Sequence, residues 1–154
     1  MLRMKFSKRF RTVGVAISLI ATGLAVFYFA MDREHLVLDD RAREKTEGSF
    51  IRLSQGMVHY ELNGPSDGPT VVLVHGFSTP YYIWDPTFEA LCHVGYRVLR
   101  FDLYGRGYSD RPNAVYNLDF FVNQLSEMTD AMQLRAPFHL AGVSMGGPIA
   151  TAYA

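Results

Sequence analysis

The chain has 154 residues, of which 49% are hydrophobic and 14% aromatic, a composition that suits one packed domain and excludes a disordered chain. Basic and acidic residues both number 15, so the formal net charge is zero, and nothing in this balance indicates a nucleic-acid-binding protein. The charge is nevertheless unevenly distributed, because five basic residues and no acidic residue precede position 13: Arg3, Lys5, Lys8, Arg9 and Arg11. The rest of the chain therefore carries an excess of negative charge.

Residues 13–31 form the first predicted element, an apolar run without a charged side chain. A helix rises about 1.5 Å per residue, so this run crosses most of a hydrocarbon layer of about 30 Å. We interpret it as a transmembrane signal anchor, with residues 1–12 as a basic N-terminus that stays in the cytoplasm. The protein is then single-pass, with its remaining part on the exported side. The alternative is a cleaved secretory signal, although the run exceeds the usual apolar length of about 7–15 residues.

Residues 32–48 are rich in charges of both signs and predict a solvated stem between the membrane and the domain. A helix is one conformation that this composition allows for the stem. The domain occupies residues 49–154. It opens with two alternating runs, 50–53 and 57–62, around a short turn at Ser54-Gln55-Gly56. This pattern predicts a β-hairpin.

Three later segments are short and apolar on both faces, which is typical of strands buried in a parallel sheet: 70–74, 97–101 and 138–141. Helical patterns alternate with them, one around Phe88 and another over residues 117–134, where Asn117 suits the N-cap position. Alternating strands and helices imply parallel crossover units. The predicted fold is therefore α/β, a doubly wound and mostly parallel sheet opened by an antiparallel hairpin.

Each of these three strands is followed by a motif, at the sheet edge where open α/β folds bind ligands. The motifs are His75-Gly76-Phe77, then Asp102-Leu103-Tyr104-Gly105-Arg106-Gly107-Tyr108-Ser109, then Gly142-Val143-Ser144-Met145-Gly146-Gly147. The last contains the GxSxG nucleophile elbow, in which a strand turns sharply into a helix. Side chains two positions either side of the serine would collide, and the two glycines remove them. GxSxG alone is a weak signal, but the three motifs together are specific.

With these motifs, residues 50–154 resemble the serine branch of the α/β-hydrolase family, which includes esterases and monoacylglycerol-lipase-like enzymes. The resemblance implies that Ser144 is the nucleophile and that the backbone N–H groups of Phe77 and Met145 form the oxyanion hole. Donors at these positions can stabilise the oxygen that becomes negative in a tetrahedral intermediate. The same resemblance gives supporting roles to five further residues of the turn and elbow: His75, Gly76, Asp102, Gly142 and Gly146. Such an enzyme needs no cofactor and no metal.

A serine hydroxyl needs an adjacent base, and in this family the triad acid and histidine follow the nucleophile in the chain. We expect a structural or solvated role, and not that of the base, for each of the five histidines: His35, His59, His75, His93 and His139. Asp102 precedes the nucleophile, so we expect it to hold the 105–109 loop by accepting backbone N–H bonds. The triad acid and histidine are thus expected outside this chain, and the chain is expected to be an N-terminal fragment that is inactive alone.

The sequence therefore predicts a membrane-anchored serine hydrolase that cleaves esters or related acyl compounds, lipids such as monoacylglycerols included. Epoxide hydrolases and dehalogenases are similar to this chain, but they carry Asp where Ser144 stands. C–C hydrolase, perhydrolase and acyltransferase activities remain alternatives on the same fold, as does a non-catalytic binding module. Tyr81, Tyr82 and Trp84 follow the oxyanion turn and either wall an acyl pocket or, for Trp84, pack the next helix. The sequence predicts no oligomeric state.

Overall fold

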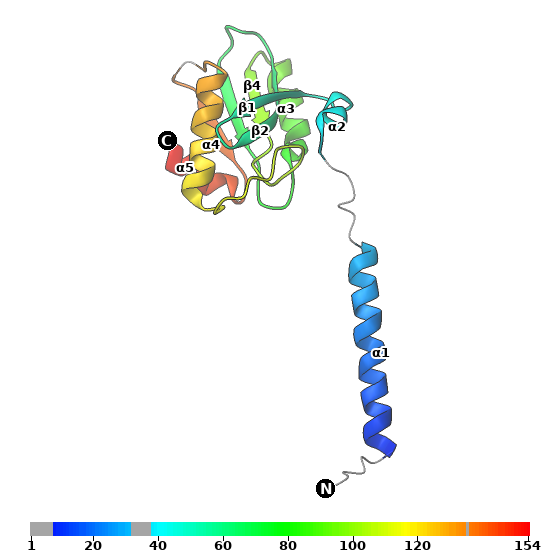
Figure 1. The fold of residues 1–154 in the computed structure, drawn as a ribbon. Helices are drawn as coiled ribbons and strands as arrows, with labels where there is room; N and C mark the ends of the chain where they lie inside the picture. The colour runs from blue at the N-terminus through cyan, green and yellow to red at the C-terminus, as the bar shows by residue number, and fades with distance from the viewer. Residues whose placement is uncertain (1–7, 32–37, 135) are drawn as a thin grey trace. The chain divides into compact units, whose positions relative to one another are not determined.

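The computed structural model describes residues 8–31, 38–134 and 136–154, with side chains from Thr12 onward. The chain divides into two compact units, Met1–Val37 and Leu38–Ala154. Where the structure describes it, the first unit is the helix α1 (Lys8–Met31), drawn in blue in Figure 1. Its segment Thr12–Met31 has a mean hydropathy of 2.1 and none of it is buried. By length and composition this helix can cross a membrane, although an N-terminal signal sequence has the same properties.

The predicted stem is described only in its second part, because residues 32–37 lie outside the described residues. A short helix, α2 (Asp40–Glu44), follows, and the Asp39 side chain caps it by accepting the Ala42 N–H at 2.9 Å. The predicted hairpin comes next, with β1 (Ser49–Leu53) antiparallel to β2 (Gly56–Asn63).

Five strands form one sheet in the order β1-β2-β4-β3-β5. Strands β3 (Thr70–Val74), β4 (Arg97–Phe101) and β5 (His139–Gly142) are parallel to one another, with β3 in the middle. Strand β2 joins the hairpin to this group by pairing antiparallel to β4. The sheet is thus mostly parallel and opened by a hairpin, which confirms the predicted fold class.

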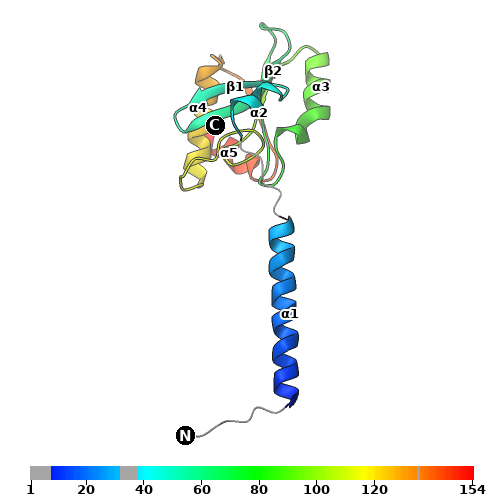
Figure 2. The same ribbon diagram turned by 45° about the vertical axis from the view of Figure 1, so that its right-hand side comes forward.

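Helices cover both faces of the sheet, as Figure 2 shows, with α3 on one side and α4 and α5 on the other. Their bounds, with the 3₁₀ turn η1 that precedes them, are η1 (Tyr81–Trp84), α3 (Asp85–His93), α4 (Leu118–Ala131) and α5 (Gly146–Tyr153). Strand β3 alternates between the two faces: Val72 and Val74 pack in the core with α4 and α5, whereas Val71 and Leu73 pack with Phe88 of α3. This two-sided burial explains the run of apolar residues in the strand.

Two boundaries differ from the predictions. The helix predicted to Leu134 ends at Ala131, and Gln133 then has a positive φ of 50°, which a helix cannot contain. The last strand begins at His139, not Phe138, and His139 and Gly142 are exposed although the pattern predicted burial on both faces. Among the described residues β5 pairs only with β3, so it forms an edge of the sheet.

Candidate active site

Parallel strands bring their carboxyl ends to one edge of the sheet, and the three sequence motifs meet there. The HG turn is residues 75–77 after β3, the Asp102 loop is residues 102–110 after β4, and the elbow is residues 142–146 after β5. The elbow leads directly into α5.

Ser144 has a positive φ of 52°, a strained backbone conformation for a residue with a side chain, and it is exposed at the tip of the elbow. The two flanking glycines are required by close packing. A Cβ on Gly142 would lie 2.2 Å from the backbone oxygen of Gly146, and a Cβ on Gly146 would lie 2.2 Å from the backbone oxygen of Val74. Because the obstructing atoms belong to backbone, they cannot move aside as a flexible side chain can. The elbow therefore has the geometry that presents a nucleophile.

The HG turn lies directly against the serine. A Cβ on Gly76 would stand 3.1 Å from the Cβ of Ser144 and 3.6 Å from its Oγ. Within the part of the chain that the structure describes, the backbone N–H groups of Phe77 and Met145 have no acceptor. The HG turn and the elbow thus each have one uncommitted backbone donor, and two such donors are what an oxyanion hole requires.

His75 is fully buried, and its hydrogen bonds define its protonation state. The Leu103 N–H donates to Nε2 at 2.8 Å, so Nε2 carries no proton. Nδ1 lies 2.7 Å from the Gly76 carbonyl oxygen and is therefore the donor of a neutral ring. Burial, the dominant cause, lowers the pKa of His75 below its ordinary value of 6.5, in accord with this neutral form. His75 is thus a structural group of the HG turn, and no hydrogen bond joins it to Ser144.

The His75 contact also orients a candidate oxyanion donor. The Gly76 carbonyl and the Phe77 N–H belong to the same planar trans peptide and point in opposite directions. When the His75 ring holds the carbonyl, the N–H on the other side of that peptide is held as well. Donation to the carbonyl also polarises the peptide, which strengthens the N–H as a donor.

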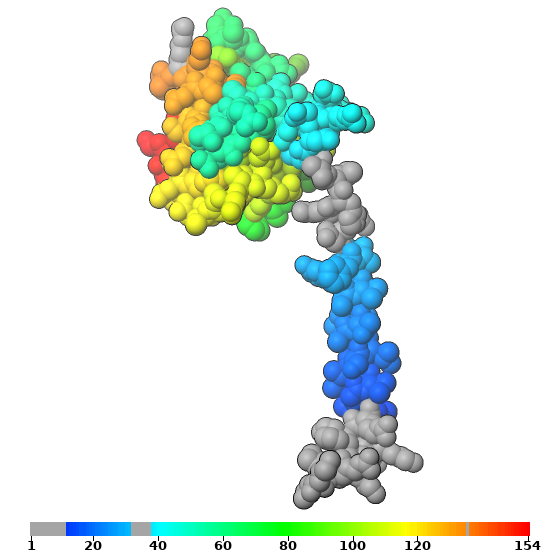
Figure 3. Space-filling model, in the orientation of Figure 1, coloured from blue at the N-terminus to red at the C-terminus, as the bar shows by residue number. Residues whose placement is uncertain are grey.

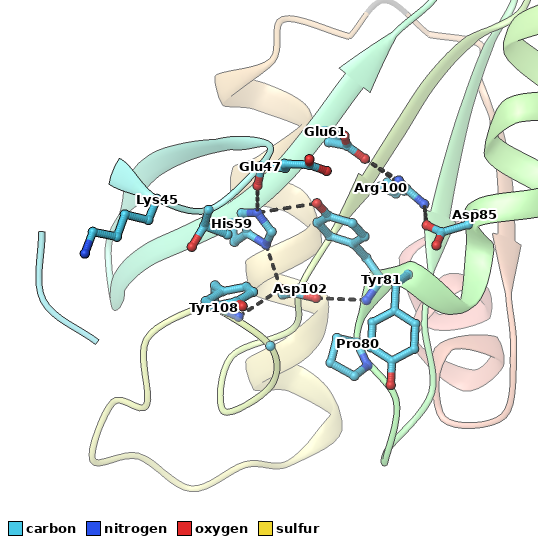
Figure 4. A pocket seen from close by; sticks show the side chains of 13 residues that line it. Lys45, Glu47, His59, Glu61, Pro80, Tyr81, Asp85, Arg100, Asp102 and Tyr108 are labelled. Carbon is cyan, nitrogen blue, oxygen red and sulfur yellow. Dashed lines mark hydrogen bonds and ion pairs between the residues drawn. The ribbon is translucent and has the colours of Figure 1, made fainter. Parts of the chain in front are cut away.

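Asp102 is 1% exposed, and its carboxylate accepts three hydrogen bonds (Figure 4). The donors are the Tyr81 N–H at 2.8 Å, the Tyr108 N–H at 3.0 Å and Nδ1 of His59 at 2.8 Å. A Cβ on Gly107 would lie 2.0 Å from Asp102 Oδ2, so the loop wraps closely around the carboxylate. Asp102 therefore holds its own loop and the start of η1, and it makes no hydrogen bond to Ser144.

His59 is the partner that the sequence did not reveal. Its ring is 3% exposed and stacks between Phe50 and Tyr81, with centroids 4.8 and 4.7 Å away. Nδ1 bonds the Asp102 carboxylate and Nε2 lies 2.7 Å from the backbone oxygen of Glu47. Through these two contacts His59 joins the segment before β1 to the Asp102 loop. Its pairing depends on β2 lying beside β4, which sequence spacing alone does not indicate.

The same segments meet at the surface of this unit. Asp110, the last residue of the Asp102 loop, accepts hydrogen bonds from Arg43 at 2.5 Å and from the Met57 N–H at 2.7 Å. In the space-filling view of Figure 3, α2 and the hairpin, in cyan and teal, border the yellow to yellow-green segment that follows β4. The Asp102 loop is therefore held by the hairpin side of the sheet as well as by its own carboxylate.

A cavity of about 440 Å³ lies next to His59 and Asp102, and Ser144 is not among its lining residues. Tyr81 and Tyr82 line this cavity, so the wall of an acyl pocket at Ser144 stays a prediction for them. Arg100 stacks between the rings of Tyr81 and Phe88, at 4.5 and 4.1 Å, and forms ion pairs with Glu61 and Asp85. Figure 4 shows Tyr81 between His59 and Arg100. The charged side chains of Arg100, Glu61 and Asp85 in the cavity wall are thus paired with one another.

Trp84 packs the next helix, which was the alternative prediction for it. It lies against the core cluster of α3 with Val71, Leu73 and Phe88. The remaining histidines lie away from the elbow or outside the described part. His93 ends α3, His139 is exposed in β5, and His35 lies outside the described residues. In the described chain no hydrogen bond connects any histidine to Ser144.

A family model described as alpha/beta hydrolase fold matches residues 69–154, more than half of the chain. The chain belongs to this family. A curated relative, the non-heme chloroperoxidase of Streptomyces lividans, is 32% identical over 93 residues, which make up 60% of this chain and 34% of the relative. Epoxide hydrolases and a haloalkane dehalogenase are also among the curated relatives. Membership of the family therefore supports hydrolase chemistry without selecting the bond that is cleaved.

Solved structures give the same fold. An esterase from Exiguobacterium antarcticum has a TM-score of 0.64 and 30% identity, covering 69% of this chain and 39% of the esterase. A membrane phospholipase A has a TM-score of 0.65 and 29% identity, covering 96% of this chain and 47% of the phospholipase. Such coverage is reached only if the match extends beyond residues 38–154 into the N-terminal unit. The chain spans about a third of the length of the first curated relatives that it matches.

Proposed function

We propose that the protein is a serine hydrolase that cleaves ester or related acyl bonds through an acyl-enzyme at Ser144. The observation that carries this proposal is the strained, exposed Ser144 beside Gly76, flanked by the uncommitted N–H groups of Phe77 and Met145. An aspartate at this position, as in epoxide hydrolases and dehalogenases, would support a different first step. The side chain here is a hydroxyl, which suits acyl transfer.

In the proposed reaction, Oγ of Ser144 attacks the carbonyl carbon of the substrate and loses its proton to a base. The carbonyl oxygen becomes negative and accepts hydrogen bonds from Phe77 and Met145. The tetrahedral intermediate then collapses, and the leaving alcohol departs with the proton that the base held. Water attacks the resulting acyl-serine ester in the same way and releases a carboxylic acid. We place the histidine base and its acid partner outside residues 1–154, after the nucleophile as is usual in this family.

We also propose that residues 13–31 anchor the enzyme in a membrane, with residues 1–12 in the cytoplasm and the hydrolase unit exported. The basic N-terminus and the length of α1 support this topology. The similarity to a membrane phospholipase A over nearly the whole chain supports an acyl lipid as the substrate class. Secretion after signal cleavage is the alternative localisation, and it leaves the same unit outside the cytoplasm.

Fluorophosphonate labelling of membranes from the source cells tests the nucleophile. Peptides from residues 81–97 identify the protein, and its labelled form is sized against the 17.4 kDa of this chain. We expect a labelled species about twice as large, and we expect Ser144→Ala to abolish both labelling and ester hydrolysis. Ser66→Ala, which changes an exposed serine in the turn before β3, is the matched control and should label normally. A protein found only at 17.4 kDa and unlabelled would favour a tethered binding module.

A second candidate is peroxide-dependent oxidation, which the similarity to a non-heme chloroperoxidase favours. Here the Ser144 acyl ester would be attacked by hydrogen peroxide instead of water and would release a peracid. Halide oxidation by the intact protein in the presence of acetate and hydrogen peroxide tests it. If halide is oxidised faster than acetate esters are hydrolysed, this candidate replaces the first.

A further inference from the structure

We propose that Arg106 is a positioning residue of the oxyanion hole, which holds Phe77 so that its backbone N–H stays directed at the oxygen of an acyl group on Ser144. The inference rests on the proposed function of Ser144. It concerns a residue of the Asp102 loop whose side chain reaches across to the HG turn.

Arg106 contacts Phe77 in two ways. Its Nε donates to the Phe77 carbonyl oxygen, and its guanidinium carbon lies 4.3 Å from the centroid of the Phe77 ring. Nη1 meanwhile donates to the carbonyl oxygen of Gly105 at 2.8 Å, which ties the guanidinium back to its own loop. These contacts use the planar shape and the several donors of a guanidinium, and a lysine ammonium cannot make all of them.

Phe77 needs such a holder because, among the described residues, only Arg106 has a ring contact with its side chain. The ring is 64% exposed and is no part of either core cluster. On its N-terminal side the residue is held through the Gly76 carbonyl, which His75 bonds. On its C-terminal side the Phe77 carbonyl is held by Arg106. With both adjoining peptides fixed, neither backbone torsion of Phe77 is free to turn its N–H away from Ser144.

Both holders are themselves positioned by the Asp102 loop. Leu103 orients the His75 ring through Nε2, and Arg106 leaves the loop from a tight turn. In that turn the Arg106 N–H donates to the Leu103 carbonyl at 3.0 Å, and the Ser109 N–H donates to the Arg106 carbonyl at 3.1 Å. The turn is thus a rigid support, and the side chain that it presents reaches the oxyanion donor.

The competing explanation is that Arg106 merely covers an exposed ring. A surface cation–π contact of that kind adds a little to the stability of a protein and has no effect on turnover. A third possibility is that Arg106 binds the substrate directly, which would weaken substrate binding when the side chain is removed. The three explanations differ in kcat, in KM and in stability.

The experiment uses the full-length membrane protein in detergent with p-nitrophenyl butyrate, an uncharged ester. For Arg106→Ala we expect kcat to fall about 10- to 100-fold, less than the ~10²–10³ expected for complete loss of one donor, with KM unchanged within about twofold. The kcat of Arg106→Lys should lie between that of Arg106→Ala and that of the wild type. Added guanidinium ions should restore part of the kcat of Arg106→Ala and none of that of Ser144→Ala. Arg52→Ala, which removes an exposed arginine on β1, is the matched control and should keep wild-type rates.

The rate of fluorophosphonate labelling separates failure of this inference from failure of the proposed function. If wild-type protein does not label, Ser144 is not the nucleophile and the proposed function fails with the inference. If wild type labels and Arg106→Ala reacts at the same rate with unchanged kcat, the inference alone fails. A rise in KM with unchanged kcat would also overturn it, in favour of substrate binding. Should Arg106→Ala fail to fold, Arg106→Met keeps the apolar contact with Phe77, and a normal kcat in that variant would overturn the inference.

Discussion

The elbow and the Asp102 loop lie at the same edge of the sheet but are built on opposite principles. The elbow depends on missing side chains, since any Cβ at Gly142 or Gly146 would meet backbone at 2.2 Å. The Asp102 loop depends on a side chain that is present, since one buried carboxylate accepts three hydrogen bonds. The elbow should therefore fail when atoms are added and the loop when atoms are removed. Only the constraint at Gly142 is local in sequence, because Gly146 meets β3 and Asp102 bonds residues of β2 and η1.

The largest effect is expected from adding one methyl group to the elbow. In Gly146→Ala the new Cβ would lie 2.2 Å from the Val74 carbonyl oxygen and 2.6 Å from that of His75. Neither atom can move without displacing β3, so we expect failure to fold or a loss of more than about 5 kcal/mol in the free energy of unfolding. Urea unfolding followed by the fluorescence of Trp84, the sole tryptophan, measures it.

Gly147→Ala is the matched control for that substitution. A Cβ at this position meets only the Gly142 backbone oxygen, at 3.8 Å, and the residue lies in helix α5. We expect it to be neutral or to stabilise the protein by up to about 1 kcal/mol, because alanine restricts the unfolded chain more than glycine does. Equal losses at both positions would contradict the steric account of the elbow.

Removing the buried carboxylate should have the next largest effect. Asp102→Ala removes the partner of His59 Nδ1 and the acceptor of the Tyr81 and Tyr108 N–H groups. We expect a loss of about 3–5 kcal/mol, because a buried partner is left unpaired. The same urea titration checks it. Asp130→Ala, at an exposed position near the end of α4, should change stability by less than about 0.5 kcal/mol.

Much of this comparison could be predicted from the sequence, and the reason is the range of the interactions. The alternating runs at 50–53 and 57–62 and the two-sided run at 70–74 depend on local periodicity, and they appear as β1, β2 and β3. The steric need for glycine at position 142 is equally local, because the obstructing atom is the backbone oxygen of Gly146. The Asp102–His59 pair is not, because it arises only when β2 lies antiparallel to β4. The stacking of Tyr81 on His59 and Arg100 could not be predicted for the same reason, since these neighbours come from other strands.

The exposure of β5 and the role of Arg106 were missed for a related reason. Apolar residues predict a buried strand, but burial depends on which strands lie alongside, and β5 has one described neighbour. Arg106 stands between two glycines of a motif, and spacing alone does not indicate that its side chain reaches Phe77. Sequence patterns thus identify the motifs, and the sheet order decides which of their side chains meet.

A third prediction uses pH through His75, whose ring bonds the Asp102 loop at Leu103 and whose backbone oxygen lies beside Gly146 of the elbow. Burial lowers the pKa of His75, so the unfolded chain takes up a proton below about pH 6.5 while the folded chain resists it. The stabilising contribution of neutral His75 is complete above pH 6.5 and decreases as the pH falls from there. Its contribution to the slope is at most about 1.4 kcal/mol per pH unit.

Urea titrations between pH 7 and pH 5 test this slope. His75→Gln supplies an uncharged amide whose oxygen can accept the Leu103 N–H, and it should show a shallower loss of stability than the wild type over this range. His93→Gln, at the exposed end of α3, should leave the slope unchanged. If His75→Gln and the wild type lose stability in parallel, His75 is not neutral in the folded protein, and the hydrogen-bond assignment of its ring is wrong.

The smallest effect is expected where the same type of contact occurs at the surface. The Asn117 side chain accepts the Phe120 N–H at 2.9 Å and caps α4, just as the Asp102 carboxylate accepts backbone N–H groups, but it is exposed and uncharged. Water can replace a lost exposed acceptor, so Asn117→Ala should cost about 1 kcal/mol, a fraction of the loss at Asp102. Asn113→Ala, an exposed change in the preceding loop, is the control. A loss at Asn117 as large as that at Asp102 would mean that burial and charge do not account for the strength of the Asp102 loop.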